Sequence, residues 1–139
     1  MQQNLVLILA RELADKLATA MFLVDPEGKL VYFNERAGEI IGESFASVGR
    51  MDITDWTEGF EPQELDGRPL PPDRLPLATA LIRKEPAHLS FRIRARDGSN
   101  REIAATAFPL FARADEFVGA AAIFWELAEN LSGDGESIR

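Results

Sequence analysis

A strict alternation between residues 88 and 96 constrains this fold more than any other sequence feature. Apolar residues occupy every second position: Leu89, Phe91, Ile93 and Ala95. Polar residues fill the positions between them: Ser90, Arg92, Arg94 and Arg96. This period of two is typical of a β-strand with one buried face. Residues 97–100, Asp-Gly-Ser-Asn, form a turn signal. Residues 102–111 and 117–127 then supply two more apolar strands, so we expect an antiparallel meander whose apolar face is covered by earlier segments.

Composition narrows the class of protein. The chain has 139 residues, 46% hydrophobic content and a net charge of −8, which suits one soluble α+β domain. An acidic protein is a poor ligand for nucleic acid, and we expect none. The arginine stripe on residues 92–96 is interpreted as a solvated strand face. There is no cysteine, so disulfides and thiol chemistry are ruled out.

The amino terminus shows no targeting signal. Residues 1–4 lack the basic region of a signal peptide, and the apolar run at residues 5–10 is too short to span a bilayer. We therefore expect a cytoplasmic protein without a membrane partner.

The first segment, residues 4–20, has helical periodicity. Leucines recur at every fourth position: Leu5, Leu9, Leu13 and Leu17. The helix could dock on its own domain or on the same helix of a second chain. Because residues 5–9 are apolar on all sides, we favour a homodimer, with an interface at Leu5, Ile8, Leu9 and Leu13.

Residues 21–33 are predicted to form a hairpin around the turn at residues 25–28. Asn34 is predicted to cap a helix that starts at Glu35, and Gly42 to end it. Short helical turns are expected at residues 45–48 and 53–56. After the proline-rich connection at 65–72, a longer helix is expected to open at residues 73–75, tolerate Pro76 in its first turn and bury one stripe.

The predicted domains are a flanking dimerisation helix (1–20), a sensor-like domain (21–129) and a disordered tail (130–139).

The order of these elements and several short motifs resemble the PAS sensor family. The matching motifs are Val24-Asp25-Pro26-Glu27-Gly28 with Val31-Tyr32-Phe33-Asn34, Ile41-Gly42, Asp66-Gly67-Arg68-Pro69-Leu70-Pro71, Leu75-Pro76-Leu77-Ala78, Arg96-Asp97-Gly98-Ser99, Val118-Gly119-Ala120 and Phe124-Trp125-Glu126-Leu127. The resemblance covers about residues 15 to 129.

The resemblance implies a five-stranded antiparallel sheet in the order 2-1-5-4-3, with helices on one face and a small ligand often held between sheet and helices. It also implies a signalling role with an output partner. One departure concerns Glu126-Leu127-Ala128, where the family commonly has Asp-Ile-Thr before an output helix. We expect the output to lie in a separate protein or in a longer parent chain.

The sequence does not identify a cofactor. The family branches that form a covalent flavin adduct or attach a hydroxycinnamoyl chromophore need a cysteine, which this chain lacks. Haem-binding relatives usually need an axial histidine. The single histidine, His88, alternates with the polar side of its strand, which argues against haem ligation. Non-covalent flavin has no supporting motif.

A small apolar ligand remains as the candidate. Its pocket is predicted to be lined by twelve residues: Phe33, Ile41, Phe45, Trp56, Leu77, Leu81, Phe91, Ile93, Thr106, Phe108, Ile123 and Trp125. The competing interpretation is that the apolar members simply fill the core.

Two functions follow from these patterns. The first is a sensor module that dimerises and passes ligand occupancy to an output partner. The second is a ligand-free module for protein–protein interaction or dimerisation. An enzyme is not expected, because the sequence offers no nucleophile–base pair, metal constellation or phosphate-binding glycine loop.

Overall fold

The computed structural model describes residues 5–16, 18–49 and 51–127. The elements follow the chain in this order: α1 (Leu5–Lys16), β1 (Ala20–Val24), β2 (Leu30–Phe33), α2 (Glu35–Ile41), α3 (Phe45–Val48), α4 (Ile53–Glu58), the 3₁₀-helix η1 (Pro72–Arg74), α5 (Pro76–Ile82), β3 (Ala87–Arg94), β4 (Asn100–Phe111) and β5 (Phe117–Glu126). The predicted order of helices and strands is confirmed. The predicted disordered tail at 130–139, residues 1–4 and Leu17 lie outside the described residues.

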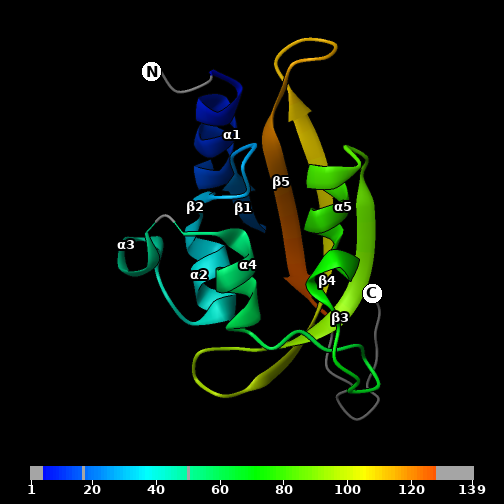
Figure 1. Cartoon of the computed structure of the whole chain (residues 1–139). Helices are drawn as coiled ribbons and strands as arrows, with labels where there is room; N and C mark the ends of the chain where they lie inside the picture. Colours follow the sequence, from blue (N-terminus) through cyan, green and yellow to red (C-terminus); the bar gives the residue numbers. More distant parts are fainter. Residues whose placement is uncertain (1–4, 17, 50, 128–139) are drawn as a thin grey trace, which may run out of the picture.

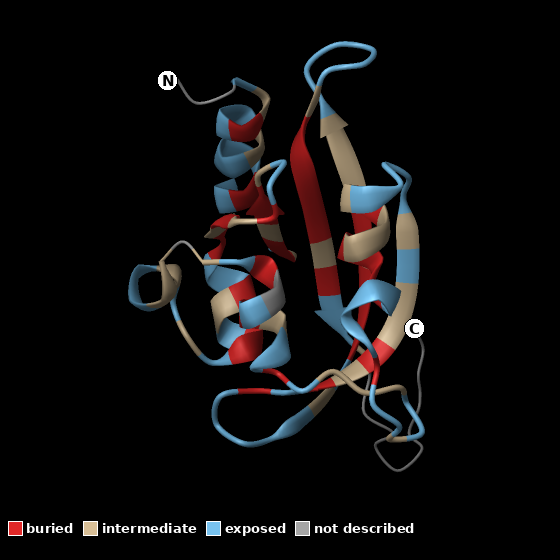
Figure 2. Ribbon diagram, in the orientation of Figure 1, coloured by how far each residue is buried: buried red, intermediate tan, exposed pale blue. Residues whose placement is uncertain are grey.

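The five strands form one antiparallel sheet in the order β2-β1-β5-β4-β3 (Figure 1). This order confirms the predicted topology. Neighbouring strands β3, β4 and β5 follow one another along the chain, whereas β1 pairs with the last strand, β5. The central position of β5 explains why its side chains are buried along most of its length (Figure 2). A central strand is covered on both faces, and it therefore loses the simple apolar–polar alternation.

The sheet carries apolar side chains on both faces, and we name the faces by their cover. The inner face packs against the helices of residues 35–82, and it holds the larger core, which includes Phe33, Trp56 and Phe124. The outer face packs against α1, and its smaller core includes Ala14 and Ala121. The helix α1 thus docks on its own domain, on the face opposite to α2, α4 and α5.

Asn34 joins the two sides of the domain. Its side-chain oxygen accepts hydrogen bonds from the backbone N–H groups of Ala37, at 3.0 Å, and Met21, at 3.1 Å. Its side-chain nitrogen donates to the carbonyl oxygens of Ala14 and Thr19, both at 2.9 Å. The predicted cap of α2 is confirmed, and the same amide also holds the carboxyl-terminal part of α1 and the start of β1. Burial makes these bonds costly to lose.

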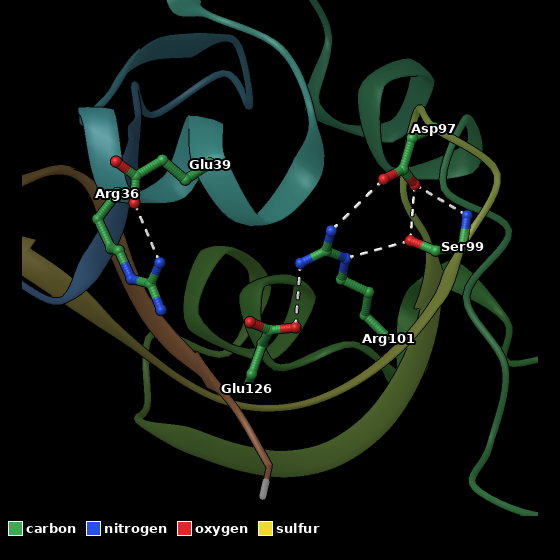
Figure 3. A network of polar contacts seen from close by, with 6 residues as sticks. All are labelled: Arg36, Glu39, Asp97, Ser99, Arg101 and Glu126. Atoms are coloured by element: carbon green, nitrogen blue, oxygen red, sulfur yellow. Dashed lines mark hydrogen bonds and ion pairs between the residues drawn. The ribbon is translucent and has the colours of Figure 1, made fainter. Parts of the chain in front are cut away.

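The hairpin between β3 and β4 is held by side chains at its turn (Figure 3). Asp97 accepts hydrogen bonds from the backbone N–H of Ser99, at 2.9 Å, and from its hydroxyl, at 2.6 Å. These bonds, first from the hydroxyl and then from the backbone, lower the pKa of Asp97. Arg101 lies between this turn and β5, where it donates to Glu126 at 3.1 Å. The turn and the end of β5 are therefore linked by one guanidinium.

Candidate ligand cavity

A cavity of about 70 Å³ lies between the inner face of the sheet and the helices that cover it. Its wall consists almost entirely of apolar atoms, and none of its side chains is ionisable. It is lined by Phe22, Ile41, Trp56, Thr57, Phe60, Pro62, Leu75, Pro76, Leu77, Phe91, Ile93, Ile103, Ala105, Ala122 and Phe124. Such a wall can hold an apolar molecule by dispersion and the hydrophobic effect, but it offers no acid or base for catalysis.

Small residues on the two central strands create the space. Ala105 on β4 and Phe124 on β5 are direct cross-strand partners, and Ala122 lies two residues before Phe124 on the same face. A strand position occupied by alanine contributes only one methyl group to the core. The alanines at 105 and 122 therefore leave a volume that larger side chains at these positions would fill.

Trp56 is the centre of an aromatic cluster beside the cavity. Its ring stacks on Phe33 at 5.4 Å and meets Phe22 and Phe60 edge-on, each at 5.2 Å. Trp56 Nε1 is buried and has no hydrogen-bond partner among the described residues. The cluster is a rigid apolar wall with one unused donor.

Five of the predicted pocket residues line this cavity: Ile41, Trp56, Leu77, Phe91 and Ile93. Three others lie in the same core without lining the cavity. Phe33 is buried and stacks on Trp56, whereas Phe45 and Leu81 are half-buried and pack against the edge of the core. The helix α2, the short helix α4, α5 and the strand β3 thus each contribute a predicted residue.

Four predicted pocket residues are placed wrongly: Thr106, Phe108, Ile123 and Trp125. All four belong to the outer face. Thr106 and Ile123 are cross-strand partners, and Phe108 and Ile123 pack in the core beside α1. Trp125 is next to the inner-face residue Phe124 and is 41% exposed. Because successive residues of a strand point to opposite faces, these side chains cannot share a cavity with their inner-face neighbours.

Several lining residues were absent from the prediction: Phe22, Thr57, Phe60, Pro62, Leu75, Pro76, Ile103, Ala105, Ala122 and Phe124. Strand pairing identifies three of them. Phe91 is predicted to face the core, and its antiparallel partner is Ile103, so every second residue after Ile103 shares that face. This rule selects Ala105 and, through the next strand pair, Phe124. It requires the register of pairing, which the sequence patterns do not supply.

The outer face carries the single histidine. His88 Nδ1 and Thr106 Oγ1 lie 2.9 Å apart and share a hydrogen bond. The His88 ring also lies 6.2 Å from the Trp125 ring. His88 therefore points away from the cavity, in agreement with its predicted place on the polar side of its strand.

The helix α1 docks through a different stripe from the one that its leucines suggest. Leu7 and Ala14 are buried. The predicted dimer residues are exposed, with Leu5 at 65%, Leu9 at 58% and Leu13 at 54%, and Ile8 just above one third. Leu5, Leu9 and Leu13 therefore face solvent in this structure.

A tyrosine couples α1 to the sheet. The Tyr32 hydroxyl donates a hydrogen bond to Asp15, and the Arg11 guanidinium lies over the Tyr32 ring at 4.3 Å. Burial, then the hydrogen bond and the negative charge of Asp15, raise the pKa of Tyr32 to about 12. The neutral phenol is therefore the form that this contact holds at physiological pH.

Two negative findings apply to the described ranges 5–16, 18–49 and 51–127. They bring together no group of three metal-ligating side chains of the His, Cys, Asp or Glu type. Among them, no helix has both the length and the apolar character needed to cross a membrane.

No protein-family model and no curated protein matches the sequence. Solved structures do match. The PAS domain of the fruit-fly ELK potassium channel has a TM-score of 0.70 at 13% identity, and the match covers 89% of this chain and 98% of that one. The PAS domain of BvgS from Bordetella pertussis has a TM-score of 0.62 at 16% identity, with 91% and 89% covered.

A light-sensing protein is also similar. The LOV domain of the EL346 blue-light activated histidine kinase from Erythrobacter litoralis has a TM-score of 0.62 at 18% identity, with 82% of this chain and all of that chain covered. At these low identities the likeness concerns the fold. The predicted resemblance is confirmed at that level, and this chain has the PAS fold.

Proposed function

We propose that this domain is a sensor module that binds a small apolar ligand and transmits its occupancy through a homodimer. The observation that carries the proposal is the apolar cavity between the inner face and the helices. Similar folds include the LOV domain of a blue-light activated histidine kinase. The absence of any ionisable side chain from the cavity wall supports a binding role and argues against an enzyme.

The size of the cavity supports a small ligand. A dry protein cavity of about 150 Å³ holds benzene or xenon. The volume here is about 70 Å³, so the ligand has only a few non-hydrogen atoms unless the walls move. A flavin or a haem is far larger than this space. We therefore propose a small neutral molecule, which leaves water for the apolar wall without losing hydrogen bonds.

The exposed stripe of α1 supports the homodimer. Leu5, Leu9 and Leu13 recur at every fourth residue and lie on the solvent side of a helix whose other side is already docked. Three neighbouring exposed leucines form an apolar surface that association would remove from water. We propose that a second copy of the chain covers it through the same stripe. A signal would then pass from the sheet to α1, which packs on the outer face.

The proposed partner is an output protein, either separate or part of a longer parent chain. A cytoplasmic location is proposed with it.

A ligand-free interaction module is the second candidate. The small cavity and the exposed leucines favour it, because a PAS fold with a nearly filled core can still dimerise through α1. In that case the cavity is a packing defect, and only the exposed surface of α1 contributes to function.

Native mass spectrometry of the untagged protein, purified from its own host, tests both candidates. We expect a dimer that carries added mass, and Ala105→Val should abolish the added mass because two methyl groups fill the cavity. Thr106→Val is the matched control, since it changes the next residue on the outer face and should retain the added mass. The ¹²⁹Xe NMR chemical shift of xenon dissolved in the protein solution gives a second readout of the empty cavity.

A dimer at the bare chain mass, with no effect of Ala105→Val on xenon binding, would support the ligand-free module. A bare monomer would contradict both candidates.

A further inference from the structure

Arg96 connects three segments that are far apart in the sequence. Its Nε donates to both carboxylate oxygens of Glu43, at 2.8 and 3.1 Å, in the segment between α2 and α3. Its Nη1 donates to the carbonyl oxygen of Gly59 at the carboxyl end of α4, at 3.1 Å. The guanidinium also lies over the Phe60 ring, at 4.4 Å from its centre. A single side chain after β3 therefore holds α2, α4 and the sheet edge together.

These contacts lie beside two of the half-buried residues of the cavity wall. Twelve of the fifteen lining residues are buried, and three are half-buried: Phe22, Thr57 and Pro62. Thr57 and Pro62 bracket Phe60, whose ring forms part of the cavity wall beneath the guanidinium. Residues 57–62, the segment that Arg96 holds, thus include two of the three lining residues that are partly exposed; the third, Phe22, lies on β1.

The contact is built more firmly than an ordinary surface ion pair. Glu43 is only 16% exposed at its side chain, so its charge is poorly solvated without Arg96. The backbone N–H of Arg96 donates to the carbonyl oxygen of Ile41, a cavity residue, at 2.9 Å. Gly59 has no side chain to obstruct the guanidinium, since a Cβ there would lie 2.9 Å from Nη1.

The main chain of the same segment has a separate anchor. The N–H of Arg94 donates to the carbonyl oxygen of Phe60 at 2.7 Å. This backbone bond fixes Phe60 to the edge of β3. At the other end of α4, a helix of six residues, the N–H of Ile53 donates to the carbonyl oxygen of Gly28 at 2.7 Å. The Arg96 side chain holds the carboxyl end of α4. Loss of the Arg96 contacts would leave these two backbone anchors in place and loosen the carboxyl end of α4 between them.

We propose that Arg96, Glu43 and Gly59 form a latch that closes the cavity and sets the rate at which small molecules enter and leave it. The latch acts on the same cavity as the proposed sensor function. Opening breaks the ion pair and the bond to Gly59, and it moves the carboxyl end of α4 away from the sheet edge. Closing restores them over a bound molecule, without any covalent step.

Acrylamide quenching of Trp56 fluorescence tests the latch without a ligand. Trp125→Phe removes the other tryptophan and provides the parent protein, in which Trp56 reports access to the cavity wall. We expect Arg96→Gln to raise the quenching rate constant about fivefold or more, because quenching of a buried indole requires local opening. Arg94→Gln is the matched control. Arg94 is two residues earlier and pairs only loosely with Glu61, at 3.6 Å, so quenching should stay at the parent value.

Gly59→Ala is the second variant, because it opens the latch without changing charge. Its backbone is in the right-handed helical region, which alanine adopts readily, and the new methyl group displaces the guanidinium. We expect quenching to rise here as well, while the urea midpoint shows a folded protein. Unchanged quenching in Gly59→Ala and in folded Arg96→Gln would overturn the latch.

The experiments can reject the latch and the sensor function independently of each other. Unchanged quenching, together with added mass that Ala105→Val removes, would reject the latch and leave the sensor. Raised quenching in a protein that never carries added mass would establish the latch and reject the ligand.

Discussion

The two faces of the sheet use the same strands for different purposes. On the inner face, β4 and β5 present Ala105, Ala122 and Phe124 to an apolar cavity under the helices. The outer face carries the residues that alternate with these along the strands, such as Thr106 and Trp125, and they lie beside α1 or reach solvent. Neighbours in sequence therefore belong to different sites, one suited to a small molecule and the other to a protein surface.

The comparison shows that apolar character alone does not assign a residue to a site. Ile123 and Phe124 are equally plausible as pocket residues by type, yet they pack in separate cores. The face is decided by strand register, and a shift of one residue would exchange the two sets. Function on one face can therefore be altered without changing the other.

The largest expected effect is a difference in unfolding free energy between substitutions at two adjacent residues that lie on opposite faces of the sheet. Phe124 is 3% exposed in the inner core, and Phe124→Ala should lower the free energy of unfolding by about 3–5 kcal/mol. Trp125→Ala, one residue later on the outer face, should cost below about 1 kcal/mol. Urea denaturation of both variants checks this. Equal losses would mean that Trp125 is buried in solution by a partner or by a different packing.

The next effect concerns Asn34, which joins the faces. Asn34→Ala leaves buried N–H and carbonyl groups of α1, β1 and α2 without partners, and we expect a loss of at least about 2 kcal/mol in unfolding free energy. Ser44→Ala is the control, because Ser44 caps the exposed helix α3. It should cost about 1 kcal/mol or less. A similar loss in both variants would show that Asn34 acts only as a helix cap.

A third prediction tests the proposed partner surface of α1. Leu9→Glu should place a charge in the dimer interface and raise the dimer dissociation constant by about a hundredfold, which light scattering would record as monomers. The control is Ile82→Glu, because Ile82 is also an exposed apolar residue but lies on α5, on the inner side. That variant should stay dimeric. A folded Leu9→Glu protein that remains dimeric would place the interface elsewhere.

The smallest predicted effect depends on pH and on the contact between α1 and the sheet. Folding raises the pKa of Tyr32 to about 12, mainly through burial and then through Asp15. A raised pKa means that folding favours the neutral phenol. The stabilisation is therefore complete below the unfolded pKa near 10 and is lost as the pH rises from about 10 to about 12.

Urea midpoints at pH 8 and pH 11 measure this contribution. The parent protein should lose more stability than Tyr32→Phe between these two values, by less than about 1 kcal/mol after allowance for solvent screening. Other groups titrate in both proteins and cancel in the difference. Parallel losses would show that α1 is not docked through Tyr32.

Local signals in the sequence were sufficient to predict structure where a segment's conformation depends mainly on its own residues. Asn34 caps α2 as predicted, and Gly42 ends that helix with a φ of 91°, which favours glycine. The alternation at residues 89–95 identified the buried face of β3, where Phe91 and Ile93 are in the core. These predictions succeeded because backbone geometry and solvent exposure are both encoded within a few neighbouring residues.

The sequence by itself determined the order of the elements, the sheet topology through its family resemblance, and one third of the cavity wall. The tertiary structure decided the rest. Residues 103–108 are apolar or small on both faces, so periodicity cannot assign Thr106 and Phe108 to a side. On α1, packing selected Leu7 and Ala14 over the more regular leucine stripe. The physical reason is the same in both cases: which apolar side chain is buried depends on the surface that it meets, and that surface is built from distant parts of the chain.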